Sequence, residues 1–148
     1  FRVEDGKFIM TRPALSGTIL ADIISKSPIS LATVNAKEKE NGIVFGIGKG
    51  AIPYLKEIQN LAKKYNAEVV ATRSVVDMQA MPYSTQVGLT GRIVSPSVYV
   101  SFGVSGAIQH IVGIENSDII ISINNDKKAP IFDYSDFGIC LDIKEFLC

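Results

Sequence analysis

Tryptophan is absent, histidine occurs once and cysteine occurs twice in the 148 residues of this chain. So few cysteines exclude a disulfide framework, and we expect Cys140 and Cys148 to be reduced thiols, as in the cytosol. The single histidine, with no Cys or His near it, excludes a His/Cys metal site. No apolar run approaches the ~20 residues that span a bilayer, so we expect no membrane insertion.

Charge of either sign is not in excess, because 15 Lys and Arg residues balance 15 Asp and Glu residues. The chain therefore has no overall field that would attract nucleic acid or an anionic membrane. The polar start at residues 1–6 predicts no signal peptide. The first residue is Phe1 and not Met, which we interpret as the sign of a piece of a longer protein. With 47% apolar and 20% charged residues, a globular domain is expected.

The first 41 residues read as an N-terminal β arm. Strands are predicted at 7–11 and 29–34, and less certainly at 19–24, with breaks at Pro13 and Pro28. Residues 37–42 are predicted to be a solvated linker. We interpret this part as a connection from a missing upstream domain.

From residue 42 to the end, strand patterns alternate with helix patterns. Strands are predicted at 43–47, 69–72, 98–102, 118–123 and 137–141, and helices at 52–65, 74–81, 105–112 and from 142 onward. Several strands are continuous apolar runs, as in a parallel sheet covered on both faces. The expected fold class is α/β, a doubly wound, mostly parallel sheet in three α/β/α layers, Rossmann-like, over residues 42–148.

Polar residues follow the predicted strands directly, where such sheets bind ligands. Lys49, Arg73, Ser105 and Asn124 are the examples. Residues 46–50, Gly-Ile-Gly-Lys-Gly, could cradle a phosphate but do not have Walker A spacing, and a tight turn is the alternative. Arg73 could face an anionic ligand or simply lie on the surface.

The predicted helix at 105–112 carries the only histidine. We expect Ser105 to cap this helix and its first N–H groups to attract an anion such as phosphate. Gln109 and His110 interrupt an apolar pattern. His110 could be a core residue with satisfied hydrogen bonds, or a site residue whose pKa of about 6.5 lies near neutral pH.

Three further polar features have two possible roles each. The loop at 86–91 could contact a ligand or only connect two elements. Residues 124–126 could meet a ligand or only turn the chain. Asp142 could cap its own helix and also accept a hydrogen bond from a ribose hydroxyl.

Four segments resemble the C-terminal domain of electron transfer flavoprotein alpha subunits. They are 86–96 (Gln-Val-Gly-Leu-Thr-Gly-Arg-Ile-Val-Ser-Pro), 104–110 (Val-Ser-Gly-Ala-Ile-Gln-His), 123–132 with its Asn124-Asn125-Asp126, and 136–139 (Asp-Phe-Gly-Ile). The resemblance covers about residues 42–147. The segments 12–14 and 31–34 resemble the family's connection into that domain.

The resemblance implies a non-covalent FAD site. It assigns FAD binding to Lys49, Thr72, Arg73, Gln86, Val87, Gly88, Thr90, Ser105, Gly106, Ala107, Ile108, Gln109, His110, Asn124, Asp142 and Ile143. By this resemblance, His110 faces the pyrimidine end of the flavin and Arg73 lies against the ring system. Thr90 would hydrogen-bond a flavin ring nitrogen. The chain departs from the family at Leu89, where Gln is usual, and at Asn125, where Lys is frequent.

The same resemblance implies an electron carrier and not an enzyme. The expected partners are a beta subunit that completes the pocket, flavin dehydrogenases such as those acting on acyl-CoA, and a quinone-linked or other redox acceptor. The expected location is the bacterial cytoplasm, or the mitochondrial matrix in a eukaryote. The alternatives are an NAD-dependent α/β enzyme of similar architecture, or a domain that is chiefly a docking surface.

Overall fold

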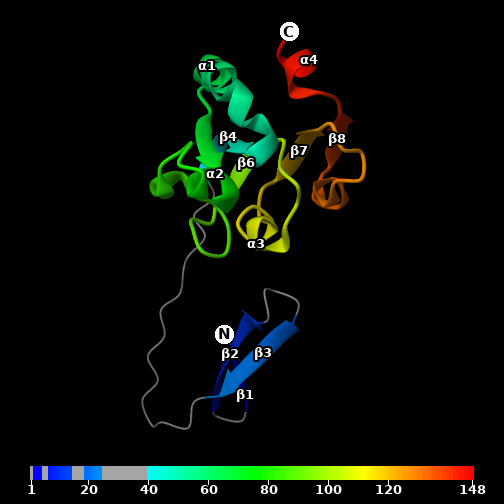
Figure 1. Ribbon diagram of the computed structural model, residues 1–148. Helices are drawn as coiled ribbons and strands as arrows, with labels where there is room; N and C mark the ends of the chain where they lie inside the picture. The colour runs from blue at the N-terminus through cyan, green and yellow to red at the C-terminus, as the bar shows by residue number, and fades with distance from the viewer. Residues whose placement is uncertain (1, 5–6, 15–18, 25–39) are drawn as a thin grey trace. The chain divides into compact units, whose positions relative to one another are not determined.

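The computed structural model describes residues 2–4, 7–14, 19–24 and 40–148 (Figure 1). The chain divides into two compact units, Phe1–Lys37 and Glu38–Cys148. In the first unit, β1 (Arg2–Glu4), β2 (Lys7–Ala14) and β3 (Ile19–Ile24) form an antiparallel sheet in that order. The strands predicted at 7–11 and 19–24 are confirmed, but the break predicted at Pro13 is wrong, because β2 continues to Ala14 and Pro13 pairs with Leu20. The strand predicted at 29–34 lies outside the described residues.

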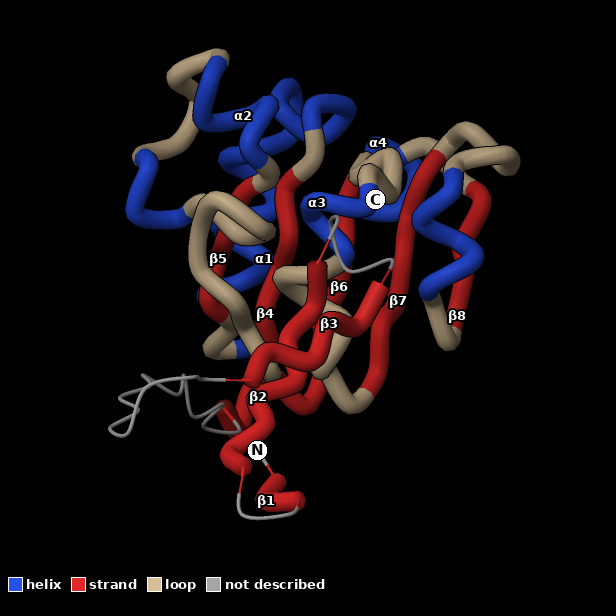
Figure 2. Tube along the Cα trace, turned by 90° about the horizontal axis from the view of Figure 1, so that it is seen from below, coloured by secondary structure: helices blue, strands red, loops and turns tan. Residues whose placement is uncertain are grey.

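The second unit is built on one five-stranded sheet. Its strands are β4 (Glu40–Ile47), β5 (Glu68–Ala71), β6 (Pro96–Phe102), β7 (Ile119–Asn124) and β8 (Phe137–Cys140). All four pairings are parallel, and the spatial order is β5-β4-β6-β7-β8, which Figure 2 shows side by side. The predicted doubly wound α/β fold is confirmed. The predicted linker is wrong for residues 40–42, because β4 begins there and Glu40 pairs with Pro96.

Alternate residues of the strands enter two separate cores, one on each face of the sheet. Val44, Tyr99 and Ile120 face one core together with residues of the 87–94 loop and α3 (Ile108–Ile111). Phe45 and Phe102 face the other core. That second core also holds residues of α1 (Leu55–Tyr65) and α4 (Ile143–Leu147), and in Figure 1 these helices lie on the opposite side of the sheet from α3. The two faces explain the nearly continuous apolar strands.

The strand order reverses between β4 and β6. From β4 the chain moves outward to β5, then crosses back over β4 to β6 and continues to β7 and β8. In open α/β sheets such a reversal opens a crevice outside the carboxyl ends of the two central strands. In this chain those ends are Gly48 and Gly103, each directly after its strand.

Several helices are shorter than their sequence pattern predicts. The segment predicted as one helix at 52–65 begins with the 3-10 turn η1 (Lys49–Tyr54) before α1. The helix α2 is Arg73–Asp77 and not 74–81, because Gln79 has φ 58°, outside the helical region. The 3-10 turns η2 (Tyr83–Thr85) and η3 (Pro130–Tyr134) were not predicted.

The prediction that Ser105 caps a helix over 105–112 is wrong. The helix α3 has only four residues, and its N-cap is Ala107 without a side-chain hydrogen bond. Gly106 has φ 96°, and a Cβ there would lie 2.2 Å from the backbone nitrogen of Ile131. Close packing of this turn against Ile131 of η3, with a positive φ at Gly106, therefore leaves no helical turn before Ile108.

Candidate functional site

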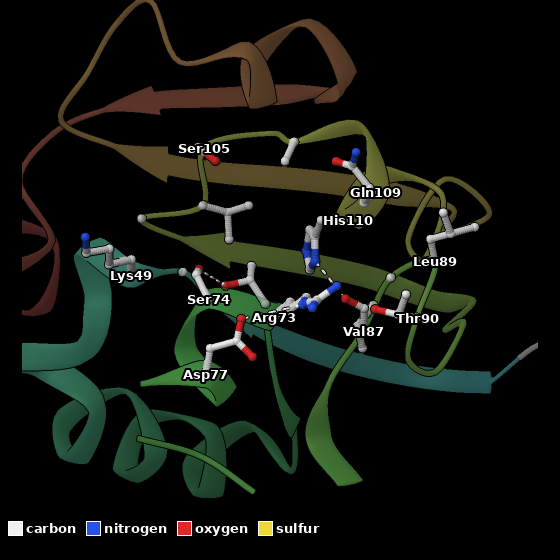
Figure 3. Close-up of a pocket in the computed structure, with 16 residues that line it drawn as sticks. Lys49, Arg73, Ser74, Asp77, Val87, Leu89, Thr90, Ser105, Gln109 and His110 are labelled. Atoms are coloured by element: carbon white, nitrogen blue, oxygen red, sulfur yellow. Dashed lines mark hydrogen bonds and ion pairs between the residues drawn. The ribbon is translucent and has the colours of Figure 1, made fainter. Parts of the chain in front are cut away.

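A cavity of about 620 Å³ opens at the carboxyl edge of the sheet, where the strand order reverses. This volume is in the range of small-molecule sites. Its lining residues, which are drawn as sticks in Figure 3, come mainly from η1, α2, the 87–90 loop and the segment 103–110. They are Gly48, Lys49, Thr72, Arg73, Ser74, Asp77, Val87, Gly88, Leu89, Thr90, Gly103, Val104, Ser105, Ala107, Gln109 and His110.

The floor of the cavity is formed by two strand ends that touch through their backbones. A Cβ on Gly48 would lie 2.1 Å from the carbonyl oxygen of Gly103. The N–H of Gly48 also donates to the carbonyl of Phe102 at 2.8 Å. Only a residue without a side chain permits this approach. The glycines predicted to cradle a phosphate therefore also join the two central strands.

Charged residues stand at the rim of the cavity. In Figure 3 Arg73 and Asp77 lie on one side, and Ser105 and Gln109 lie on the opposite side. Arg73 Nε lies 3.5 Å from Asp77 Oδ2, and the two side chains are 68% and 63% exposed. An exposed pair at this spacing is worth little in stability. Arg73 can therefore exchange Asp77 for an anionic ligand at low cost.

The 86–91 loop is held in place by its own backbone. Val87 N–H donates to the carbonyl of Ala71 at 2.9 Å, and Leu89 N–H donates to the carbonyl of Gln109 at 2.7 Å. Gln86 is buried, and its amide nitrogen donates to Thr90 Oγ1 at 2.9 Å and more weakly to the Thr90 carbonyl at 3.2 Å. Gln86 therefore braces the loop, while Val87, Gly88 and Thr90 line the cavity.

His110 is buried and hydrogen-bonded at both ring nitrogens. Nδ1 lies 3.1 Å from the carbonyl oxygen of Val87, and Nε2 lies 2.9 Å from the hydroxyl of Tyr99. Burial lowers the pKa of His110, and the hydrogen bond to Val87 opposes that shift in part. His110 therefore has satisfied hydrogen bonds, as a core histidine does, and it also lines the cavity, so its role as a site residue stays a prediction.

The family described as "Electron transfer flavoprotein FAD-binding domain" matches residues 38–115. This match covers more than half of the chain, including β4, the 86–91 loop and α3. The chain belongs to this family. The resemblance found in the sequence motifs is thus confirmed, and the cofactor that the family's description names is FAD.

Curated relatives agree with the family match. The chain is 36% identical to "Protein FixB" of Clostridium saccharobutylicum over 146 residues, which is 99% of the chain and 42% of that relative. It is 46% identical to "Electron transfer flavoprotein subunit alpha, mitochondrial" of Oryza sativa subsp. indica over 102 residues, 69% of the chain and 28% of the relative.

A third relative, "Electron transfer flavoprotein subunit alpha" of Paracoccus denitrificans, is 44% identical over 98 residues, 66% of the chain and 32% of the relative. The chain thus spans between 28% and 42% of the length of these three relatives.

The backbone beside the cavity fits the phosphates of FAD. The N–H groups of residues 105–109 donate to no acceptor within the described part of the chain, whereas those of His110 and Ile111 donate to the carbonyl of Ala107. Ser105, Ala107 and Gln109 line the cavity. Adjacent backbone N–H groups without acceptors can bind an anion. Lys49 and Arg73 on the same lining add positive charge.

The structure gathers most of the predicted site residues around this cavity. Those on its lining are Lys49, Thr72, Arg73, Val87, Gly88, Thr90, Ser105, Ala107, Gln109 and His110. The remaining ones, which are not on it, are Gln86, Gly106, Ile108, Asn124, Asp142 and Ile143. That these residues contact FAD stays a prediction.

The residues away from the cavity have structural roles of their own. Asn124 is buried, and its amide nitrogen donates to the carbonyl of Val104 at 2.8 Å, which fixes the turn that enters the site. Asp142 caps α4 by accepting from Lys144 N–H at 2.8 Å. Ile143 is buried in the second core.

Ser74 and Asp77 line the cavity but were not predicted to do so. Ser74 Oγ lies 3.0 Å from Thr72 Oγ1, and Asp77 pairs with Arg73. The spacing of Arg73 and Asp77, four residues apart on a helix, is a signal that could have revealed Asp77.

Two absences apply to the described residues. Among them, no helix combines the length and the apolar character needed to cross a membrane. No three His, Cys, Asp or Glu side chains of that part of the chain group together as metal ligands.

Proposed function

We propose that this domain binds FAD in the cavity between the ends of β4 and β6, and that it serves as the FAD-binding part of an electron transfer flavoprotein. The observation that carries the proposal is the run of N–H groups without acceptors at 105–109, at the point where the strand order reverses. An FAD diphosphate would supply the acceptors that this segment lacks.

The other residues that line the cavity suit different parts of FAD. Lys49 and Arg73 provide positive charge for anionic atoms, and Arg73 can leave Asp77 to do so. The apolar Val87 and Leu89, with Gly88 between them, suit contact with a flat ring. The hydroxyl of Thr90 can hydrogen-bond a ring nitrogen, because it lines the cavity and is held by Gln86.

FAD supplies the redox chemistry, since it accepts and donates the electrons itself. The chain's residues hold the cofactor and set the charge around it. His110 contributes a neutral ring, whose Nδ1–H donates a hydrogen bond to the Val87 carbonyl. No nucleophile or general base is required, so we propose an electron carrier and not an enzyme.

The partners follow from the family. The relatives are named as alpha subunits, so we propose a beta subunit as the partner that completes the pocket. Flavin dehydrogenases, such as those acting on acyl-CoA, would donate electrons, and a quinone-linked or other redox protein would accept them. We propose the bacterial cytoplasm or the mitochondrial matrix as the location, since one relative is named as mitochondrial and others are bacterial.

Equilibrium dialysis of the full 148-residue chain against FAD, with NAD as the competing ligand, tests this function. We expect saturable FAD binding and no competition by NAD. The variant Gly48→Val should lose FAD binding, because its Cβ would lie 2.1 Å from the Gly103 carbonyl oxygen and force apart the two strand ends that form the floor. Saturable NAD binding without FAD binding would favour the NAD-dependent enzyme and refute the proposal.

A further inference from the structure

In the described part of the chain the His110 ring has two hydrogen-bond partners, Val87, which lines the cavity, and Tyr99, which does not. Tyr99 belongs to β6, is fully buried, and faces the core that contains Val87 and Ile111. Its hydroxyl lies 2.9 Å from His110 Nε2, and the two ring centroids are 6.1 Å apart. No sequence motif indicated this contact, because the two residues are separated by the turn at 103–107.

The two hydrogen bonds of His110 determine which nitrogen carries the proton. A carbonyl oxygen can only accept, so Nδ1 must be protonated to donate to Val87. In the neutral ring Nε2 is then an acceptor, and the Tyr99 hydroxyl donates to it. If Nε2 carried a second proton, the Tyr99 oxygen would have to accept a hydrogen bond from it. The hydroxyl proton of Tyr99 would then be buried without a hydrogen-bond acceptor, which costs free energy.

We propose that Tyr99 is a positioning residue, which holds His110 in the neutral form protonated at Nδ1 and fixes its ring against the cavity. In the chain without a ligand, both ring nitrogens are then hydrogen-bonded to the protein. This state of His110 does not depend on the proposed function.

Two further observations support the proposal. Gly46 on the neighbouring strand makes room for the tyrosine, because a Cβ there would overlap the Tyr99 hydroxyl at 1.7 Å. The other charged side chains on the lining shared with His110 are Lys49, Arg73 and Asp77. Two cations and one carboxylate give no net negative field that would favour a charged ring. The lowered pKa of His110 agrees with this arrangement.

The chain has a single histidine, so NMR of its imidazole nitrogens reports His110 without assignment. The experiment uses the full chain without FAD. We expect the Nδ1-protonated form, with a titration midpoint below the ordinary histidine pKa of about 6.5. The Nε2-protonated form, or titration at the ordinary pKa, would overturn the proposal.

The variant Tyr99→Phe removes only the hydroxyl. We expect its His110 to keep the Nδ1 proton, because Val87 still accepts it, but to lose the hydrogen-bond shift at Nε2 and to have a pKa raised towards the ordinary value. Tyr54→Phe, in the other core, should leave the wild-type spectrum. Unchanged nitrogen shifts in folded Tyr99→Phe would refute the role of Tyr99. If Tyr99→Phe does not fold, the wild-type spectrum still decides. Because no FAD is present, these outcomes are independent of the FAD-binding test.

Discussion

The two polar clusters on this cavity differ in how far their hydrogen bonds are already satisfied. Tyr99, His110 and the Val87 carbonyl form a closed, buried network in which each group has a protein partner. Arg73 and Asp77 form an open, exposed pair at the rim. Groups in a closed network contribute to the fold and the shape of the site. Groups in an open pair are free to bind a ligand, so the same cavity has a rigid wall and an adaptable rim.

The largest effect is expected from Gly46→Ala, which breaks the rigid wall. The new methyl group would overlap the Tyr99 hydroxyl, so the tyrosine must leave its place. We expect the free energy of unfolding to fall by about 3 kcal/mol, as for severe overpacking. Urea denaturation measures this change. Gly50→Ala is the control, because its nearest atoms lie at 3.6 Å. Equal stability of the two variants would contradict the packing described here.

Tyr99→Phe should have the next largest effect on stability. The variant keeps the ring but leaves His110 Nε2 without its donor in the core. We expect a loss of about 1–3 kcal/mol in the free energy of unfolding. Denaturation beside Tyr54→Phe, a half-buried tyrosine, isolates the cost of the hydrogen bond. A loss no greater than that of Tyr54→Phe would show that the closed network adds nothing to stability.

Acid should destabilise the protein through His110. The pKa of this group is lowered in the folded chain, so below its ordinary value of about 6.5 the unfolded chain binds the proton more readily. This contribution to stability is present at higher pH and is lost as the pH falls from about 6.5 towards the folded pKa, by up to about 1.4 kcal/mol per pH unit. Denaturation curves between about pH 7 and about pH 5.5 measure it.

In His110→Gln the free energy of unfolding should no longer fall with pH through histidine protonation, since no other histidine is present. A slope that persists in the variant would assign the proton uptake to another group.

The adaptable rim should respond in binding and hardly in folding. Arg73→Ala removes a cation that is 68% exposed, so we expect the free energy of unfolding to change by less than about 0.5 kcal/mol. FAD affinity should fall by about tenfold, the loss of one charge-assisted contact. Asp77→Asn frees Arg73 and should raise affinity slightly. Calorimetric titration checks both, and an Arg73→Ala variant with full affinity would remove Arg73 from the site.

The sequence predicted the parallel sheet well because several strands are nearly continuous apolar runs, such as 43–47. It also placed Lys49, Arg73 and Ser105 at the cavity, because residues that follow parallel strands meet at one edge. Such positions depend on the fold class alone.

Side-chain orientation could not be predicted in the same way. Gln86 and Asn124 are polar residues in the right segments, yet their amides turn inward to hold the backbone. The partner of His110 depends on Tyr99, and Ser105 loses its capping role because the chain packs against Ile131. These outcomes arise from contacts between distant residues, on which local pattern carries no information.

The most direct test of the FAD site is a map of backbone amide shifts in the full chain as FAD is added. The account predicts that the amides of residues 105–109 shift most, together with those of 48–49 and 87–90. Shifts confined to other surfaces, or none at saturating FAD, would contradict the account.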